Sequence, residues 1–141
     1  EMLSKINAFR ADYDLTLIGA PKWESFETLD LDYLQNLNYH GYSTSYINHD
    51  DSLFRHFDET FSLKYRYEPT SAVYKGFDMM NYFGRAFFQF GNSFINKLHE
   101  FKSLGYTMNF NFKRDGVSDG WENQYIHIFR YDDFRIKKLN R

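Results

Sequence analysis

The first third of the chain carries a hydrophobic pattern that predicts a strand, a helix and a second strand. Residues 15–18 form a short apolar run that stops at the turn sequence Gly19-Ala20-Pro21. Apolar residues then recur at helical spacing from Leu29 to Leu37. Within residues 39–47, Tyr42, Thr44 and Tyr46 alternate with other residues, as in a strand. This order of elements favours a βαβ unit in which the two strands are parallel.

The middle of the chain predicts two longer helices separated by a break at Glu68-Pro69. Asp50 or Asp51 can cap the first helix, whose apolar face consists of Phe54, Phe57, Phe61 and Tyr65. In the second, Ser71 to Phe90, apolar residues occupy almost every side, so we expect it to be covered over most of its circumference. Gly91 fits the left-handed position after a helix end.

The last third begins with another expected helix, Phe94 to Leu104, and then changes to a period of two. Residues 106–112 alternate between apolar and polar, a polar loop covers 113–123, and a further strand is expected over 124–131. The two strands predict a long-looped antiparallel hairpin, followed by a basic tail from Arg135 to Arg141. The expected fold class is α/β, with three layers, a parallel βαβ unit, additional helices and a C-terminal antiparallel hairpin.

Composition narrows the classes of function. A chain of 141 residues fits one ordinary domain, and a net charge of -2 lacks the basic excess of nucleic-acid-binding modules. No apolar run approaches the roughly 20 residues that cross a bilayer, so we expect no membrane insertion. The absence of cysteine excludes disulfides and thiolate chemistry. Aromatic residues make up 21% of the chain, which fits an aromatic core, a ligand platform or a surface that meets other protein.

Catalytic and metal-binding patterns do not emerge from the residue spacing. His49, Asp50, Asp51 and His56 match no zinc-site spacing, and Asp115 and Asp119 lack the alternating acids of a calcium loop. We find no nucleophile elbow, phosphate-binding glycine loop or defined acid–base pair. The sequence therefore predicts a non-enzymatic protein without a cofactor or metal.

The order of several local strings resembles the second half of type I periplasmic binding proteins, the branched-chain amino-acid receptor family. The run from Leu15 to Pro21 is similar to the family's strand that ends in a Gly-Pro loop at the cleft. The segment Ala72 to Asp78, with its Gly-Phe-Asp, looks like the entry to the family's crossover helix. The strings from Phe110 to Arg114, Gly120 to Asn123 and Tyr125 to Tyr131 are similar to its final hairpin. A closer likeness is to the receptor-like domains that Bacteroidetes append to LysM modules.

The resemblance implies a partial type I periplasmic-binding-protein fold, in which residues 1–141 form the C-terminal segment of a bilobed domain. Residues 1–68 would lie mainly in one lobe and 69–141 mainly in the other. It further implies a place in the periplasm or cell envelope, a small polar ligand, and an upstream half of the same protein as partner. Homo-oligomers are expected of the isolated segment, and peptidoglycan association would come through another domain.

The expected ligand-binding residues are Pro21, Trp23, Tyr74, Phe77 and Asp78. Trp23 follows a strand end and could stack on a ligand or simply pack against the protein. Asp78 could receive a ligand's donor, or it could instead cap a helix or bond internally. Where the amino-acid receptors carry an acid for the ligand's ammonium, this chain has Ala20-Pro21-Lys22-Trp23. The alternative function is a protein–protein interaction or oligomerisation module with a vestigial cleft.

Overall fold

The computed structural model describes residues 2–19 and 30–140, and these form two compact units. Unit 1 comprises Glu1–Ser43 and His127–Arg141, and unit 2 comprises Thr44–Ile126. Pro21 and Trp23 lie outside the described residues. The expected lobe division at residue 68 concerns a longer receptor and stays a prediction.

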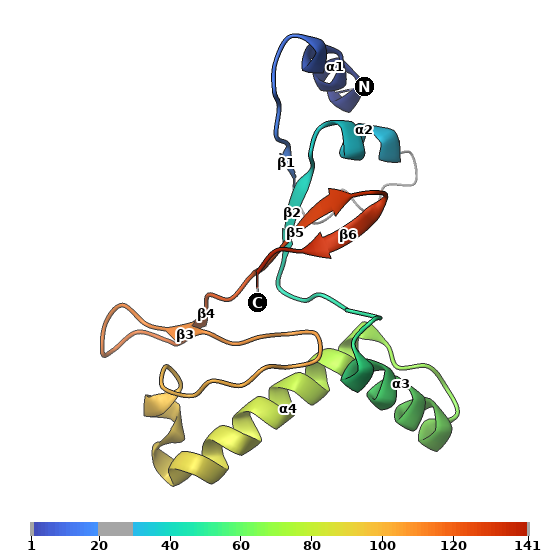
Figure 1. Cartoon of the computed structure of the whole chain (residues 1–141). Coiled ribbons are helices and arrows are strands. Elements are labelled where there is room, and N and C mark those ends of the chain that lie inside the picture. The colour runs from blue at the N-terminus through green and yellow to red at the C-terminus, as the bar shows by residue number, and fades with distance from the viewer. Residues whose placement is uncertain (1, 20–29, 141) are drawn as a thin grey trace. The chain divides into compact units, whose positions relative to one another are not determined.

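Unit 1 contains a four-stranded sheet in the order β1-β2-β5-β6 (Figure 1). Its strands are β1 (Ile18–Gly19), β2 (His40–Ser43), β5 (His127–Asp132) and β6 (Arg135–Lys138). β1 and β2 are parallel and joined through α2 (Leu31–Asn36), which confirms the predicted βαβ unit, while β5 is antiparallel to both β2 and β6. The chain begins with α1 (Met2–Ala8) and the short 3₁₀ helix η1 (Phe9–Ala11).

The core of unit 1 is small and lies between α2 and the sheet. Leu34, Tyr39 and Phe129 are buried there, and Leu17 and Tyr131 pack around them. In this core, Leu34 of α2 meets Tyr39, which directly precedes β2, and Phe129 of β5. The core joins segments that lie almost 100 residues apart in sequence.

Unit 2 is built on two helices, α3 (Ser52–Tyr65) and α4 (Ser71–Phe90). Asp51 caps α3, because its carboxylate accepts hydrogen bonds from the backbone N–H groups of Leu53 and Phe54 at 2.8 and 3.3 Å. α4 has the bounds that the sequence predicted, and Gly91 follows it with a positive φ of 58°. The unit continues through the 3₁₀ helix η3 (Gly91–Lys97) to the short antiparallel pair β3 (Phe112–Lys113) and β4 (Glu122–Asn123).

An aromatic core holds α4 to the irregular segments that follow it. Tyr82, Ala86, Leu98, Phe101 and Phe110 are its buried members. The Tyr82 hydroxyl donates to the carbonyl oxygens of Leu98 and Phe101 at 3.1 and 3.2 Å. Because these carbonyls lie beyond the end of η3, a single buried phenol ties the irregular backbone to the helix.

Two of the helix predictions are wrong. The residues predicted as a helix from Phe94 to Leu104 instead form part of η3 and then turns, since the Tyr82 hydroxyl and the aromatic core bind this backbone in a non-helical path. α4 is not covered on most sides: its buried residues are Tyr74, Asp78, Tyr82 and Ala86, a single stripe with a spacing of four. Apolar composition on every side of a helix does not ensure burial when only one side has a neighbour.

The pairing predicted for the C-terminal hairpin is also different in the structure. Residues 127–132 pair with β2 and β6 rather than with 106–112, and a ladder of only two residue pairs joins β3 and β4. The basic tail supplies β6, so an antiparallel C-terminal hairpin exists, but it is made of β5 and β6. Among the described residues, no helix is long and apolar enough to span a membrane.

Candidate functional site

The parallel pair in unit 1 defines the edge at which a ligand site was expected. Ile18 is opposite His40 and Gly19 is opposite Gly41, so both strands run toward the same edge of the sheet. In open α/β sheets, ligands bind outside the carboxyl ends of such strands. Pro21 and Trp23 follow Gly19 in the sequence, and their positions are not described.

Asp78, another candidate ligand-binding residue, is buried in unit 2, and both of its carboxylate oxygens accept hydrogen bonds from the same chain. Its side chain is 1% exposed. Oδ1 accepts from the backbone N–H of Tyr106 at 2.7 Å, and Oδ2 accepts from the N–H of Thr107 at 2.7 Å and of Met108 at 2.9 Å. The Thr107 hydroxyl donates to Oδ2 as well, at 2.9 Å. These four bonds correspond to the internal hydrogen-bonding alternative, in which the carboxylate organises a turn.

The turn at residues 105–108 is shaped around this carboxylate. A Cβ on Gly105 would lie 2.8 Å from the Asp78 Cγ and 2.2 Å from the Met108 carbonyl oxygen, so no side chain fits there. The backbone N–H of Gly105 donates to Asn109 Oδ1 at 3.1 Å, which closes the turn from its other side. The alternation over 106–112 predicted a strand here and missed the turn. Gly105 and Asn109 were the signals, since both residues favour turns.

Tyr74 and Phe77, the other two candidates, belong to an aromatic cluster that we define as Phe54, Phe57, Tyr74, Phe77 and Tyr106. Phe57 on α3 is central, with ring centroids 4.7 Å from Phe77, 5.2 Å from Tyr106 and 5.8 Å from Tyr74. The cluster joins α3, α4 and the Asp78 turn. It therefore brings Tyr74, Phe77 and Asp78 into one region of unit 2, where each contributes to packing, and their role toward a ligand stays a prediction.

The Tyr74 hydroxyl donates a short hydrogen bond to Oδ1 of Asp58 on α3. Burial raises the pKa of Tyr74 most strongly, and the Asp58 carboxylate raises it further because it stabilises the protonated phenol. The phenol is therefore neutral over the physiological range. It is a positioning group between two helices and has no tendency to act as a base.

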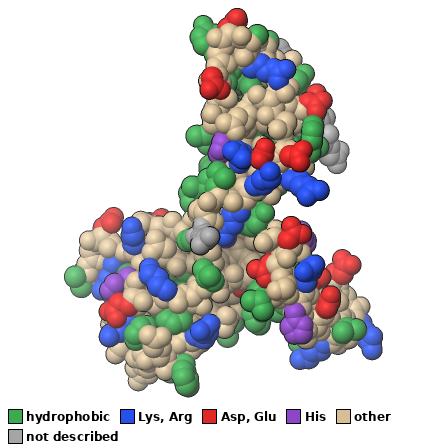
Figure 2. All heavy atoms as spheres, viewed as in Figure 1, with side chains coloured by type: hydrophobic (Ala, Val, Ile, Leu, Met, Phe, Trp, Pro, Cys, Tyr) green, Lys and Arg blue, Asp and Glu red, His purple; other side chains and the backbone are tan. Residues whose placement is uncertain are grey.

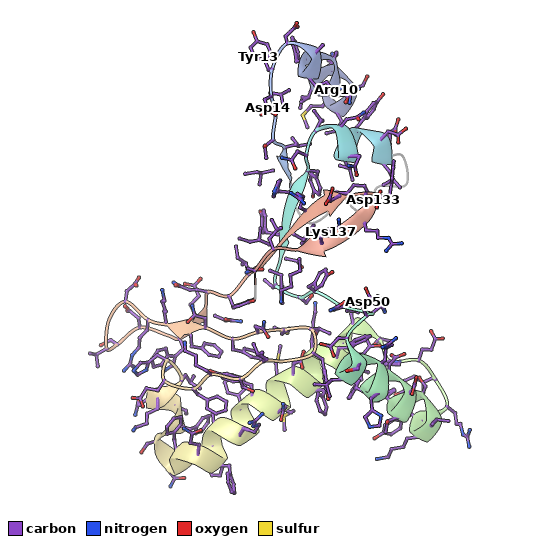
Figure 3. The ribbon with its side chains drawn as sticks, in the orientation of Figure 1. Arg10, Tyr13, Asp14, Asp50, Asp133 and Lys137 are labelled. Carbon is purple, nitrogen blue, oxygen red and sulfur yellow. The ribbon has the colours of Figure 1, made fainter. Side chains whose placement is uncertain are left out.

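Two open hollows occur at places that the sequence did not indicate. One, of about 700 Å³ in unit 1, is lined by Arg10, Ala11, Asp12, Tyr13, Asp14, Leu15, Asn36 and Asn38. Arg10, Tyr13 and Asp14 lie on η1 and the segment that follows it (Figure 3). These residues precede β1, and the two asparagines precede β2, so the hollow lies at the amino ends of the parallel strands, opposite the expected edge.

The second hollow, of about 320 Å³, lies in unit 2 and is lined by Lys102, Ser103, Leu104, Asn109, Phe110, Asn111 and Tyr125. The Lys102 ammonium donates to Asn111 Oδ1 at 3.4 Å across it. Turns create both hollows, and turns carry no periodic hydrophobic signal.

Three charged side chains pair on the surface of the β5–β6 hairpin. Asp132 accepts from Lys137 at 2.7 Å and from Arg130 at 2.9 Å on the β5–β6 hairpin. Hydrogen bonding to Lys137 is the main reason that the pKa of Asp132 is lowered, and Arg130 adds to it. Within residues 2–19 and 30–140, no three His, Asp or Glu side chains come together as metal ligands would.

Comparisons with known proteins give one structural likeness. No family model and no curated protein matches the chain. Among solved structures, the chain is similar to an ABC transporter substrate-binding protein from Desulfitobacterium hafniense in complex with Leu, with 17% sequence identity and a TM-score of 0.47. The likeness covers 96% of this chain and 39% of that one, so the chain spans well under half of that protein's length.

Proposed function

We propose that the chain is a non-catalytic, receptor-like segment of a bacterial cell-envelope protein, and that it contributes part of a cleft for a small polar ligand. The observation that carries this proposal is the parallel pairing of β1 and β2, which brings the carboxyl ends of both strands to one edge. Such an edge is where open α/β sheets bind ligands. The Leu15–Pro21 string resembles the family's strand that ends at the cleft, which supports a ligand site at this edge. We propose the envelope location and the upstream half because the resembling family has both.

The residues after Gly19 give this edge a chemical character. Lys22 and Trp23 follow Gly19-Ala20-Pro21 in the sequence, so a cation and a large aromatic ring occur within four residues of the last residue of β1. A lysine disfavours a ligand's ammonium group and attracts a carboxylate. The ligand class that fits is therefore a small anionic or hydroxylated compound with a face on which Trp23 can stack.

Tryptophan fluorescence tests this proposal directly, because the chain has only two tryptophans, Trp23 and Trp121. A Trp121→Phe variant leaves Trp23 as the single tryptophan. Titration with amino acids, acidic sugars and muropeptides should give a saturable change in its emission for one class. The same class should raise the melting temperature of the wild-type chain, because a ligand that binds the folded state stabilises it.

The matched control is Trp23→Phe, which keeps Trp121 in the other unit. Its emission should not respond, and the ligand-induced rise in melting temperature should shrink or vanish. Because the upstream half completes the proposed cleft, the same compounds are also tested on the protein that carries both halves, and no rise in its melting temperature with any of them contradicts the proposed function. Binding that survives in Trp23→Phe would contradict the role given to Trp23.

A second function, an interaction module, is favoured by a different observation. Large apolar side chains on α4 are exposed, among them Phe88 at 92% and Met80 at 75%. Hydrophobic side chains are visible among the charged ones on the surface of each unit (Figure 2). Exposed apolar side chains that gather on one element are candidates for a protein interaction site. Self-association of the chain, measured by sedimentation velocity, tests this second function.

A further inference from the structure

One side of α4 combines protruding apolar side chains with flat positions in a regular order. Gly76, Met80, Gly84 and Phe88 follow one another at intervals of four residues, so they form a single row along the helix. A Cβ added at Gly76 or Gly84 would meet no atom within 4 Å, so both glycines face open space. Along the row, glycines that carry no side chain therefore alternate with the protruding side chains of Met80 and Phe88.

The row lies on the side of α4 that faces away from the protein's own core. The buried stripe of the helix is Tyr74, Asp78, Tyr82 and Ala86, and at 100° per residue its centre points roughly opposite to the centre of the row. Val73, Phe77 and Phe87 extend the same side, although Phe77 also packs against Phe57 of α3 and Phe87 against Phe94, which leaves them 40% and 51% exposed. Lys75 and Arg85 point at least about 60° away from it. This side of the helix therefore has no charged residue, although its two protruding side chains are 75% and 92% exposed.

The alternating glycines and large side chains of this row are complementary to the same row on a second copy whose α4 is antiparallel to the first. A two-fold axis midway between Met80 and Gly84 places Met80 opposite the partner subunit's Gly84, and Phe88 opposite the partner subunit's Gly76. Each contact occurs twice, as the isologous interface of a symmetric dimer requires. Rows with a spacing of four pack into each other at a crossing angle of about -50°, the commonest arrangement of packed helices.

We propose that a second copy of this chain covers this side of α4, in an antiparallel pair that seats Met80 and Phe88 against Gly84 and Gly76. Glycine is unfavourable inside a helix, and no contact with the described residues of the chain requires it at either position. Close approach of another helix accounts for both glycines. Phe77, Met80, Phe87 and Phe88 expose about 500 Å² per copy, at roughly 200 Å² for a large apolar side chain. The pair would bury about 1,000 Å², at the lower limit of specific interfaces, so the dimer should be weak and concentration-dependent.

This dimer supplies the second proposed function with a partner and a surface, and it does not depend on the ligand cleft. Sedimentation velocity over a series of concentrations should show the wild-type chain passing from monomer to dimer. Met80→Glu and Phe88→Glu should each remove the dimer, since they place a carboxylate against the partner's backbone. Met79→Glu is the matched control, because this neighbouring methionine is 42% exposed but points away from the row, and it should leave the dimer intact.

Gly84→Ala separates a role in the interface from a role in folding. Alanine favours the helix and has free space in the single chain, so the melting temperature of the monomer should rise. The same methyl group fills the position that receives Met80, so dimer affinity should fall by about tenfold or more. Opposite changes in these two measurements are expected of the proposed interface and would not arise from a purely structural glycine.

The antiparallel register can be tested by crosslinking, because the chain contains no cysteine. Under oxidation, a mixture of Met80→Cys and Gly84→Cys chains should form a mixed disulfide faster than either variant crosslinks with itself. A chain that stays monomeric at every concentration overturns the proposal, and so does one that is monomeric but binds lipid vesicles through this side. A dimer unaffected by Met80→Glu would keep the interaction function and overturn this surface. Ligand-dependent Trp23 fluorescence in Met80→Glu reports on the cleft separately.

Discussion

Gly41 on β2 and Phe129 on β5 are direct cross-strand partners, and the Phe129 ring lies over the glycine. A Cβ on Gly41 would be 2.3 Å from Cε2 and 2.5 Å from Cζ of that ring. Phe129 is 3% exposed and belongs to the core of unit 1. The glycine therefore gives an aromatic ring its place in the core, and it couples the N-terminal βαβ unit to the C-terminal hairpin.

Gly41→Ala should destabilise unit 1 by about 1–3 kcal/mol, because the methyl group forces the ring and its neighbours to move. Phe129→Ala should cost about 3–5 kcal/mol. In a Phe129→Ala background, Gly41→Ala should be nearly neutral, since the space is then free. Urea unfolding of the four proteins in this cycle measures the coupling, and strictly additive losses would show that the two residues do not interact.

Asp78→Asn should lower the free energy of unfolding by about 1.5–3 kcal/mol. The amide can keep one oxygen for the three donors at Oδ2, but its NH₂ group would then face the Tyr106 N–H. Hydrogen exchange gives the specific readout: the amides of Tyr106, Thr107 and Met108 should exchange slowly in the wild type and faster in the variant. Unchanged protection at all three amides would contradict the role of the carboxylate.

Asp51→Ala should destabilise α3 by about 0.5–2 kcal/mol, because two N–H groups of its first turn lose their acceptor. Asp50→Ala is the matched control, since this adjacent exposed acid does not cap the helix (Figure 3). In thermal unfolding, the melting temperature of Asp51→Ala should fall clearly below that of Asp50→Ala. Equal effects would mean that net charge near the helix, rather than capping, is what stabilises it.

Tyr74→Phe should change the alkaline branch of the stability profile. The pKa of Tyr74 is raised in the folded chain, whereas the unfolded phenol titrates near its ordinary value of about 10. From pH 10 upward the unfolded state therefore loses the proton first, and the free energy of unfolding falls by up to about 1.4 kcal/mol per pH unit from this residue.

The variant lacks the phenol, so its stability should fall less steeply above pH 10. Below pH 10 it should be uniformly less stable by about 1–3 kcal/mol, through loss of the hydrogen bond to Asp58. Burial also raises the pKa of Tyr46 and Tyr82, so part of the alkaline slope should remain in both proteins. Parallel profiles above pH 10 would contradict the shift at Tyr74.

Local features were predictable from the sequence because their causes lie within a few residues. The bounds of α4 follow from the Glu68-Pro69 break and from Gly91, and the start of α3 follows from its capping acids. The sequence left Asp50 and Asp51 as alternatives, and hydrogen bonding selects Asp51. The parallel pairing of β1 and β2 followed from the order of strand, helix and strand.

The sequence alone thus determined the bounds of α4, the start of α3 to within one residue and the pairing of the first two strands, since capping, turns and short crossovers act over short separations. Tertiary structure alone decided that residues 127–132 add to β2, that Asp78 holds a turn 28 to 30 residues away, and that the described residues bury only one stripe of α4. Periodicity reveals that a residue is apolar or that a strand exists. Which segment packs against an apolar residue, or pairs with a strand, depends on contacts between distant parts of the chain. Such contacts leave no pattern in the local sequence.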